Sequence, residues 1–496
     1  MKIQIDNFGP IHYFECDLDK DLHLILGTNN IGKSYGITVV YLLVKSLMEF
    51  AEETFSIEFS AHMRQMPSEV LEQVSALNVG DELDIIATVK DETTKLLQDG
   101  FLTRFQDYVE GTFGSMDTIG NRFSREEPHI RLVFGWGRMD IGVSDNAFIV
   151  GGSTIENMLK SIKVRCVEED KTDKIIENEQ ANLIIYHRKD NNDLGYSFFS
   201  VISIYLFLVI CQALAKIHTI HYLPASRSGL YPALSAFGQI VAELAKSRSY
   251  LNSRIQLPGI AVPLSDYFLQ LSQIKPNKKQ DEDNPIHRIA DDIERDILKG
   301  TVEFDKKTRE LFYIPNGTGP KLDMGASSSM VSELSPIVSF LRHIVSKPAR
   351  KQRAPQLSLV EIFREILQKI PQEGSPPKPL LFIEEPEAHL HPENQLRLMA
   401  AFAALANAGV KVMITTHSDF LFNKLNNLIL EKKIDTAAVS AMLFRQTEKG
   451  GEAVPLPMDE LGIEDDNFID TTEALYDEKV DLIDRMNRGG DDGDAG

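Results

Sequence analysis

The chain has 496 residues, of which 43% are hydrophobic and 25% charged, and its formal net charge is −21. This length allows roughly two to four domains, and the composition excludes a disordered, collagen-like or disulfide-framework protein. Residues 458–496 have 14 acidic and 3 basic side chains, so the chain before them is only mildly acidic. A net negative chain is poorly suited to nonspecific adhesion to nucleic acid or anionic membrane as its main activity.

Cysteine spacing and the apolar segments indicate the compartment. Three cysteines, Cys16, Cys166 and Cys211, lie far apart without zinc-site or disulfide-framework spacing, so a reducing cytoplasm fits best. The amino terminus lacks the apolar core of a signal peptide. The 22 uncharged residues over 194–215 are long enough to span a membrane. We interpret them as a buried core helix, since a span would put the two motifs described next on opposite sides of the membrane.

In chain order, short strands open the sequence and a helix follows. Alternating and apolar patterns predict strands over Lys2–Asn7, Ile11–Cys16 and Leu22–Leu26, then a core helix over 33–50. Residues 51 to about 125 are charge-rich and mostly helical in pattern. Further strands are predicted over His129–Gly135, Ile141–Val150, Lys163–Val167 and Asn182–Tyr186. Helical patterns occupy about 230–300, residues 349–379 form a surface excursion, and the composition of 487–496 predicts disorder.

A glycine-rich loop lies between the third predicted strand and the first helix. Its sequence satisfies G-x-x-x-x-G-K-[ST], and strand, loop and helix follow in the order that this phosphate-binding motif requires. The backbone would wrap phosphates, Lys33 would reach the β and γ phosphates, and Ser34 would ligate magnesium. The nucleotide-binding residues predicted here are Gly27, Thr28, Asn29, Asn30, Ile31, Gly32, Lys33 and Ser34.

A second apolar strand ends in adjacent carboxylates. In PLLFIEEPEAHLHP, Glu384 would hold the magnesium shell and Glu385 would orient or deprotonate the attacking water. Glu384 stands where aspartate is usual and is one methylene longer, which suits contact through a bound water. His389 and His391 have an H-x-H spacing, but a loop role beside the acids is favoured over a metal site.

A third apolar strand leads into a histidine. The stretch VKVMITTHSD ends in hydroxyls and His417, thirty residues after the carboxylates, and this histidine can contact a γ phosphate. The phosphate loop and the carboxylates are 352 positions apart, although a compact nucleotide-binding unit needs only a few strands between them. A large lobe is therefore expected to be inserted within one head.

These three elements together resemble the ABC-type ATPase superfamily in its SMC, RecF and OLD branch, and are most similar to stand-alone OLD-like bacterial ATPases with an AAA domain. The resemblance covers residues 1–50, about 218–235 and about 300–485. It implies an α/β ABC-type P-loop NTPase head split by an inserted mixed or helical lobe. The expected division is 1–50 and 300–486 for the two parts of the head, 51–217 for the lobe, 218–299 for a coupling loop and helical segment, and 487–496 for a disordered acidic tail.

The resemblance also implies a signature segment that meets the γ phosphate of the opposite subunit. Ser327, Ser328 and Ser329 lie in the right place, before a helix, although the usual paired glycines are missing and a plain helix cap is the alternative. The stretch YLPASRSG around Arg227 resembles the loop that couples the nucleotide site to the lobe, but the glutamine common in transporters is absent. The role of Arg227 stays open.

Two charged stretches remain. The basic run over 342–353 has no acidic residue, and either a phosphate-contacting patch or, more readily, a solvated loop would explain it, since no aromatic residues interleave to stack bases. The acidic stretch before the end alternates apolar and charged residues, as a closing amphipathic helix would. Its function cannot be read from the pattern.

The resemblance thus implies a cytoplasmic ATPase that uses ATP and Mg²⁺, hydrolysing ATP to ADP and phosphate. It would act as a homodimer or higher even oligomer and as a switch or sensor for a separate effector protein, in a bacterial antiviral defence or toxin-type system, with no membrane partner. The alternative is a RecF-like DNA-binding repair ATPase, so binding of nucleic acid is left open. A transporter's nucleotide-binding subunit is disfavoured by the large lobe and the missing glutamine.

Overall fold

The computed structural model describes residues 1–54, 68–135, 137–155, 160–168, 176–179, 182–188, 198, 201–203, 205–206, 209–210, 213–230, 260–275, 283–317, 319–347, 376–459, 462–464 and 476–483. Within these residues the strands of one large mixed sheet dominate. Their order in space is β11-β15-β16-β3-β17-β18-β2-β1-β5-β6-β7. Their bounds are β1 Lys2–Phe8, β2 Ile11–Asp17, β3 Leu22–Gly27, β5 His129–Phe134, β6 Gly137–Ser144, β7 Ala147–Ile155, β11 Ile217–Leu223, β15 Lys378–Glu384, β16 Lys411–Thr415, β17 Val439–Thr447 and β18 Gly450–Pro455.

The half of this sheet from β11 to β17 is parallel. Its central strands β3, β15 and β16 are mostly apolar because both of their faces are covered, as parallel sheets require. In β15, Leu380 and Phe382 pack into one core cluster while Leu381 and Ile383 pack into the other. Continuous apolar runs such as LHLIL and LLFI are therefore central strands, and the α/β fold expected from the sequence is confirmed.

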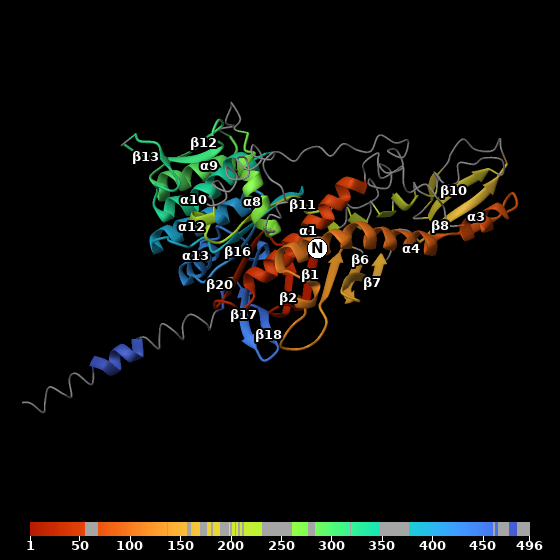
Figure 1. The fold of residues 1–496 in the computed structure, drawn as a ribbon, viewed down its shortest axis with the longest axis horizontal. Coiled ribbons are helices and arrows are strands. Elements are labelled where there is room, and N and C mark those ends of the chain that lie inside the picture. The colour runs from red at the N-terminus through yellow and green to blue at the C-terminus, as the bar shows by residue number, and fades with distance from the viewer. Residues whose placement is uncertain are drawn as a thin grey trace, which may run out of the picture.

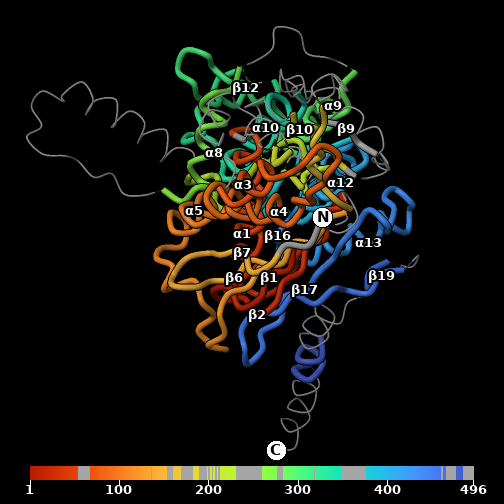
Figure 2. The backbone as a smooth tube through the Cα atoms, turned by 90° about the vertical axis from the view of Figure 1, so that its right-hand side faces the viewer, coloured from red at the N-terminus to blue at the C-terminus, as the bar shows by residue number. Residues whose placement is uncertain are grey.

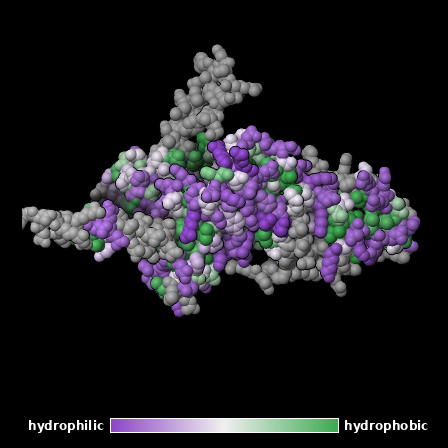
Figure 3. Space-filling view, turned by 90° about the horizontal axis from the view of Figure 1, so that it is seen from below, coloured by the Kyte–Doolittle hydropathy of each residue, from purple (hydrophilic) through white to green (hydrophobic). Residues whose placement is uncertain are grey.

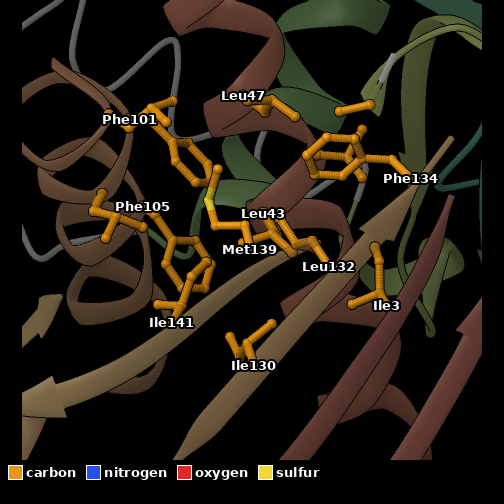
Figure 4. Packing of buried hydrophobic residues seen from close by; sticks show 14 of the residues in the cluster. Ile3, Leu43, Leu47, Phe101, Phe105, Ile130, Leu132, Phe134, Met139 and Ile141 are labelled. Atoms are coloured by element: carbon orange, nitrogen blue, oxygen red, sulfur yellow. The ribbon is translucent and has the colours of Figure 1, made fainter. Parts of the chain in front are cut away.

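In the other half the pairing is antiparallel, except that β18 and β2 run parallel to each other. β1 pairs with β2 and β5, and β5, β6 and β7 continue as a meander. A layer of helices lies on its inner face, and Figure 4 shows the contact: Leu43 and Leu47 of α1 and the rings of Phe101 and Phe105 meet side chains of β1, β5 and β6, whose labelled members are Ile3, Ile130, Leu132, Phe134, Met139 and Ile141.

Helices cover both faces of the sheet. On the face of the first cluster lie α1 Lys33–Thr54, α4 Ile86–Leu96, the π-helix η1 Leu97–Leu102 and α5 Thr103–Phe113. On the other face or at its edge lie α8 Val262–Ser272, α9 Pro285–Ile293, η4 Glu294–Leu298, α10 Ser329–Phe340, η5 Leu341–Val345, α12 Pro392–Asn407 and α13 Asp419–Leu430. Short 3-10 turns are η2 Met116–Thr118 and η6 Thr436–Ala438.

Smaller sheets extend the molecule. One has the order β4-β8-β10-β9, with β4 Glu82–Asp84, β8 Ser161–Val167, β9 Ile176–Glu179 and β10 Asn182–Arg188. It lies with α3 (Ser68–Ser75) at the end of the long axis opposite to α12 and α13 (Figure 1). Near α9 and α10 is β12-β13-β14, with β12 Gly300–Asp305, β13 Glu310–Pro315 and β14 Leu322–Asp323. The last pair is β19 Met458–Asp459 with β20 Gly462–Ile463.

Two expectations about residues 51–217 are corrected by the strand pairing. The strand predicted over Ile141–Val150 is two strands joined by a turn, because Asp145 and Asn146 both adopt positive φ (50° and 59°), as a tight hairpin turn needs. The meander β5–β7 continues the sheet of β1 and β2, so these strands belong to the head sheet and not to a separate lobe. The part of 51–217 that stands away from the head is the sheet β4-β8-β10-β9 with α3 (Figure 1).

The apolar helices lie inside the molecule. Among the described residues one stretch, Lys33–Glu53 of α1, is long and apolar enough to cross a membrane, and it is mostly buried in the fold. The segment over 194–215 is only partly described, but most of its described side chains, among them Phe198, Val201 and Leu206, are buried in the same cluster as α1. On the face seen in Figure 3 the exposed side chains are mostly hydrophilic, with apolar ones gathered in small patches.

The closing helix expected in the acidic stretch is present over residues 476–483, but it does not close onto the core. It stands apart from the body in both views (Figures 1 and 2), and its apolar side chains are exposed, Tyr476 to 66% and Leu482 to 51%. The helical piece within 349–379 and the residues 487–496 lie outside the described residues.

Candidate nucleotide-binding site

The candidate site lies at the carboxyl edge of the parallel strands. The phosphate loop follows β3, the paired glutamates end β15, and His417 follows β16 by two residues. β16 lies between β3 and β15, with Thr415 opposite both Ile25 and Glu384. Ligands of open α/β sheets bind at this edge. Three motifs separated by up to 390 positions therefore meet because their strands are neighbours in the sheet.

The phosphate loop has the backbone of an anion-binding turn. Gly27 and Gly32 adopt φ of +143° and +106°, and a Cβ on Gly27 would lie 2.9 Å from the carbonyl oxygen of Phe444, so only glycine fits there. Asn30 also has a positive φ, of 61°. The first turn of α1 begins at Lys33, directly after this loop, so its free N–H groups face the site.

Lys33 is buried, and its ammonium closes the loop. Its Nζ donates to the carbonyl oxygens of Gly27 (2.8 Å) and Thr28 (2.7 Å). Burial lowers the pKa of Lys33 to about 8, while the carboxylates of Glu385 and Glu387 oppose this shift. This side chain is a cation held in a partly dehydrated position, where a phosphate would be a strong partner.

The structure brings Lys33, Glu385 and His417 together. The ring nitrogens of His417 lie 3.3 Å (Nδ1) and 3.2 Å (Nε2) from Lys33 Nζ, and Nε2 lies 3.5 Å from Oε1 of Glu385. The Glu385 side chain is 40% exposed, and its residue adopts a φ of 41°. The backbone of Glu385 is thus strained, and its carboxylate is partly exposed beside a histidine and a lysine. This arrangement is suited to hydrolysis of a phosphoanhydride.

The side chain of Glu384, unlike that of Glu385, is directed into the fold. Tyr222 donates a hydrogen bond to Oε1 of Glu384 and receives one from Thr38 Oγ1 at 2.8 Å, and Ser34 also hydrogen-bonds Glu384. Burial raises the pKa of Glu384 above its ordinary value, and the hydrogen bonds of Tyr222 and Ser34 counteract this. The pKa of Tyr222 is raised well above 10, chiefly by burial, so this phenol stays a donor.

Glu387 holds the histidine loop. Its Oε1 accepts from Thr416 Oγ1 (2.6 Å) and from the backbone N–H of His417 (2.7 Å). Its other oxygen is buried and has no hydrogen-bond partner among the described residues. This carboxylate therefore fixes the backbone that places His417.

The two other histidines of the acidic motif are exposed and outside this cluster. His391 is the N-cap of α12 and accepts from the N–H of Glu393, while His389 adopts a φ of 61° in the turn before it. No group of three or more histidine, cysteine, aspartate or glutamate side chains among the described residues could hold a metal ion.

Ser327, Ser328 and Ser329 lie at the start of α10. Ser328 is its N-cap and accepts from Val331 N–H, and Ser327 donates to the carbonyl oxygen of Asp323. In the part of the chain that the structure describes, no hydrogen bond joins these serines to the phosphate loop of the same chain. Their hydroxyls are presented at the surface, with Ser328 and Ser329 exposed.

Arg227 is fully buried and lies between α10 and the glutamates. Its guanidinium donates to the carbonyl oxygens of Glu384 (Nη1, 2.8 Å) and Glu385 (Nη2, 3.3 Å) and forms an ion pair with Glu333 of α10 at 3.2 Å. Neither side chain of this pair is exposed at all. The sequence singled out Arg227 without giving it a role.

Sequence reasoning missed four residues of this site: Tyr222 and Glu333 as partners, Glu387 as an anchor, and Gly451 of β18. A Cβ on Gly451 would lie 2.0 Å from the carbonyl oxygen of Ile31, so β18 supports the phosphate loop directly. The paired glycines Gly450 and Gly451, after Lys449, are the one signal in the sequence that could have indicated the support of the loop by β18. The others depend on strands and helices far apart in the sequence.

In the described part of the basic run over 342–353, Arg342 and His343 are packed within the fold. Arg342 forms ion pairs with Asp291 (2.5 Å) and Glu294 (2.8 Å), and its side chain is 9% exposed. Burial lowers the pKa of His343 to about 4, so this ring is neutral at pH 7. Arg350, Lys351 and Arg353 lie outside the described residues.

Comparison with known proteins agrees with this kind of site. Residues 355–422, which include Glu384, Glu385 and His417, match the family model described as AAA ATPase domain. No curated protein matches the chain. Among solved structures, the chain is similar to an SMC head domain from Thermotoga maritima (10% identity, 92% of this chain and 98% of that one, TM-score 0.33) and to an SMC head bound to the C-terminal winged-helix domain of ScpA (10%, 92% and 98%, TM-score 0.36). A third is an SMC head with an extended coiled coil bound to a ScpA domain derived from Pyrococcus furiosus (10%, 96% and 98%, TM-score 0.33).

The strand order and the site define a mixed α/β fold in which a loop with the phosphate-binding pattern follows β3, paired glutamates follow β15 and a histidine follows β16, all at one edge of the sheet.

Proposed function

We propose that the chain binds ATP with Mg²⁺, hydrolyses it to ADP and phosphate, and dimerises on ATP as a switch for a separate effector. The observation that carries this proposal is the contact of Lys33, Glu385 and His417, which come from three loops at one sheet edge. A chance glycine turn would not meet a carboxylate and a histidine from two other strand ends.

The reaction follows from these positions. Lys33 leaves the loop carbonyls for the β and γ phosphate oxygens, and the N–H groups at the start of α1 hold the same phosphates. Glu385 takes a proton from a water that attacks the γ phosphorus, and the bond to the β–γ bridging oxygen breaks to release ADP. His417 donates to a γ-phosphate oxygen and limits its movement.

The residues present fit a magnesium ion. Ser34 and Glu384 are hydrogen-bonded to each other and supply a hydroxyl and a carboxylate, the hard oxygen ligands that Mg²⁺ prefers. Two protein ligands suffice because Mg²⁺ in nucleotide sites takes its other ligands from phosphates and water. The ion would neutralise charge on the β and γ phosphates.

A dimer is proposed because the serines at the start of α10 lie at the surface, with Ser328 and Ser329 exposed, and no hydrogen bond among the described residues joins them to the phosphate loop of their own chain. Hydroxyls and free N–H groups at a helix start suit an anion, and Ser327, Ser328 and Ser329 would meet the γ phosphate bound by a second copy. Two such contacts related by a twofold axis make a closed homodimer or the unit of a higher even oligomer.

We further propose an OLD-like switch in a bacterial antiviral defence or toxin-type system, in the cytoplasm. Its support is the string EEPEAHLHP with TTHSD, the small lobe that stands away from the head (Figure 1), and two buried free cysteines, Cys16 and Cys166. The alternative, a RecF-like DNA-binding ATPase, gains nothing from Arg342, whose charge is taken up by an internal ion pair.

The test uses Glu385→Gln, which keeps the phosphate-binding groups and removes the base. We expect ATP turnover to fall by at least about 100-fold and ATP with Mg²⁺ to convert the chain to a stable dimer in sedimentation velocity. Glu393→Gln is the matched control, since Glu393 is an exposed carboxylate on α12 whose ion pair among the described residues is with Arg397. Its turnover should equal that of the wild type.

Wild-type turnover in Glu385→Gln, or a monomer at saturating ATP, would contradict the proposal. Retention of the ATP-bound dimer on duplex DNA, measured in the same samples, would favour the repair alternative.

A further inference from the structure

We infer that Arg227 is a positioning residue that couples the start of α10 to the paired glutamates, with the buried ion pair to Glu333 as the link. The inference rests on the proposed function, because it assigns to this ion pair the control of turnover by the helix that follows the proposed signature segment.

Arg227 contacts each of the segments that the proposed coupling joins. Its Nη1 donates to the carbonyl oxygens of Pro224 and Glu384, its Nη2 to that of Glu385, and its Nε to that of Glu333. One planar group thus holds the backbone of both acids, the loop after β11 and the helix α10. A lysine has no such fork and could not make these bonds together.

Glu333 completes the connection from the side of α10. Its Oε2 accepts from the backbone N–H of Arg227 (3.2 Å) and its Oε1 from that of Ser228 (2.9 Å), in addition to the ion pair. Glu333 lies about one helical turn after the N-cap Ser328. A rotation or shift of the start of α10 therefore moves the carboxylate that holds Arg227.

The end of β11 also contacts the paired glutamates. Tyr222, at the end of β11, holds the side chain of Glu384, while Arg227 holds its backbone. Between them Ser226 adopts a φ of 56°, and Glu385 adopts a φ of 41°. The hydrogen bond from Arg227 to the carbonyl oxygen of the strained Glu385 indicates an over-determined geometry at that residue. The carbonyl contact at Glu385 fixes the direction in which its carboxylate leaves the strand.

This arrangement predicts how the site responds to a second copy. If the serines before α10 engage a partner's nucleotide, the resulting movement of α10 reaches Glu385 through Glu333 and Arg227. Binding of ATP to the chain's own phosphate loop involves neither residue. Disruption of the ion pair should therefore lower kcat and leave the affinity for ATP unchanged.

The experiment compares Glu333→Gln, Arg227→Lys and the double variant with the wild type in the full chain. We expect kcat to fall at least about tenfold in each single variant, with KM and the stoichiometry of bound ATP analogue within about twofold. The double variant should be no slower than the worse single variant, because both substitutions break one link. Controls are Glu393→Gln and Arg295→Lys, which alter exposed ion pairs of α12 and η4.

A merely structural role gives another pattern, in which the loss of kcat follows the loss of ATP-binding sites and kcat per occupied site is unchanged. That result, or additive effects in the double variant, would overturn the inference. If the wild type binds but does not hydrolyse ATP, the proposed function fails instead, before the variants are compared.

A second measurement tests the coupling without substituting Arg227 or Glu333, in case those variants do not fold. Hydrogen exchange of Glu385→Gln is followed with and without ATP and Mg²⁺. We expect protection to rise together at the start of α10 and over residues 222–228. Protection confined to the phosphate loop would overturn the coupling.

Discussion

At the residue scale, Lys33 is the residue on which the proposed nucleotide binding depends most directly. Its Nζ donates to the carbonyl oxygens of Gly27 and Thr28 in the loop, and hydrogen bonds to charged groups each contribute about 1.5–3 kcal/mol. We expect Lys33→Ala to weaken ATP binding by at least about tenfold in an equilibrium titration with a fluorescent analogue.

The control for this substitution lies on the same helix. Lys45 forms ion pairs with Glu49 (2.7 Å) and Asp266 (3.1 Å), more than three helical turns beyond the loop. Lys45→Ala should bind ATP within about twofold of the wild type. An affinity in Lys33→Ala equal to that of this control would refute the assignment of the phosphate loop.

The residues at strand ends could be predicted from the sequence because each follows a short apolar run. Lys33, Glu385 and His417 come directly after the central strands β3, β15 and β16 or within a few residues of them. Glu333 and Arg227 could not be predicted as a pair. They are 106 positions apart, and only the packing of α10 against the loop after β11 brings them together.

At the element scale, β3 makes stability depend on pH. His23 lies in this central strand, 1% exposed, and its Nε2 has no hydrogen-bond partner among the described residues. Burial lowers its pKa from 6.5 to about 3. Between about pH 3 and pH 6.5 the His23 ring is therefore protonated in the unfolded chain and neutral in the folded chain. The free energy of unfolding consequently decreases as the pH falls below 6.5.

We expect His23 to cost about 2 kcal/mol of unfolding free energy on going from pH 7.5 to pH 5. His221, whose pKa burial lowers to about 4, acts in the same direction. Urea unfolding at the two pH values should show a smaller pH-dependent loss for His23→Gln than for the wild type. An equal loss in both proteins would show that His23 does not titrate on unfolding.

The helices and strands could be predicted where the apolar pattern extends over many residues or where typical turn residues separate two strands. The strands at 2–8, 11–17 and 22–27 and the helix α1 match the expected bounds within a few residues. The hairpin β6–β7 could not be separated, because Asp145 and Asn146 carry the turn within a stretch of otherwise regular strand residues. The pairing of β1 with β5 is long-range, so no local pattern indicates that this meander belongs to the head.

At the scale of the whole molecule, the site is shared between two chains if the serines before α10 complete it. Two defects in different chains then complement each other. Lys33→Ala removes the nucleotide from its own phosphate loop but leaves its serines intact. Ser329→Arg keeps the phosphate loop and places a bulky side chain at the exposed start of α10, while the N-cap Ser328 stays in place.

Each variant alone should be inactive as a homodimer, and the mixture should recover ATP turnover. Random pairing makes about half of the dimers mixed, and each of these has one complete site, so recovery should approach about a quarter of the wild-type rate per chain. Ser329→Ala, which adds no bulk, should stay active alone. Full activity of Ser329→Arg by itself, or a mixture no more active than the separate variants, would mean that each chain hydrolyses ATP without its partner's α10.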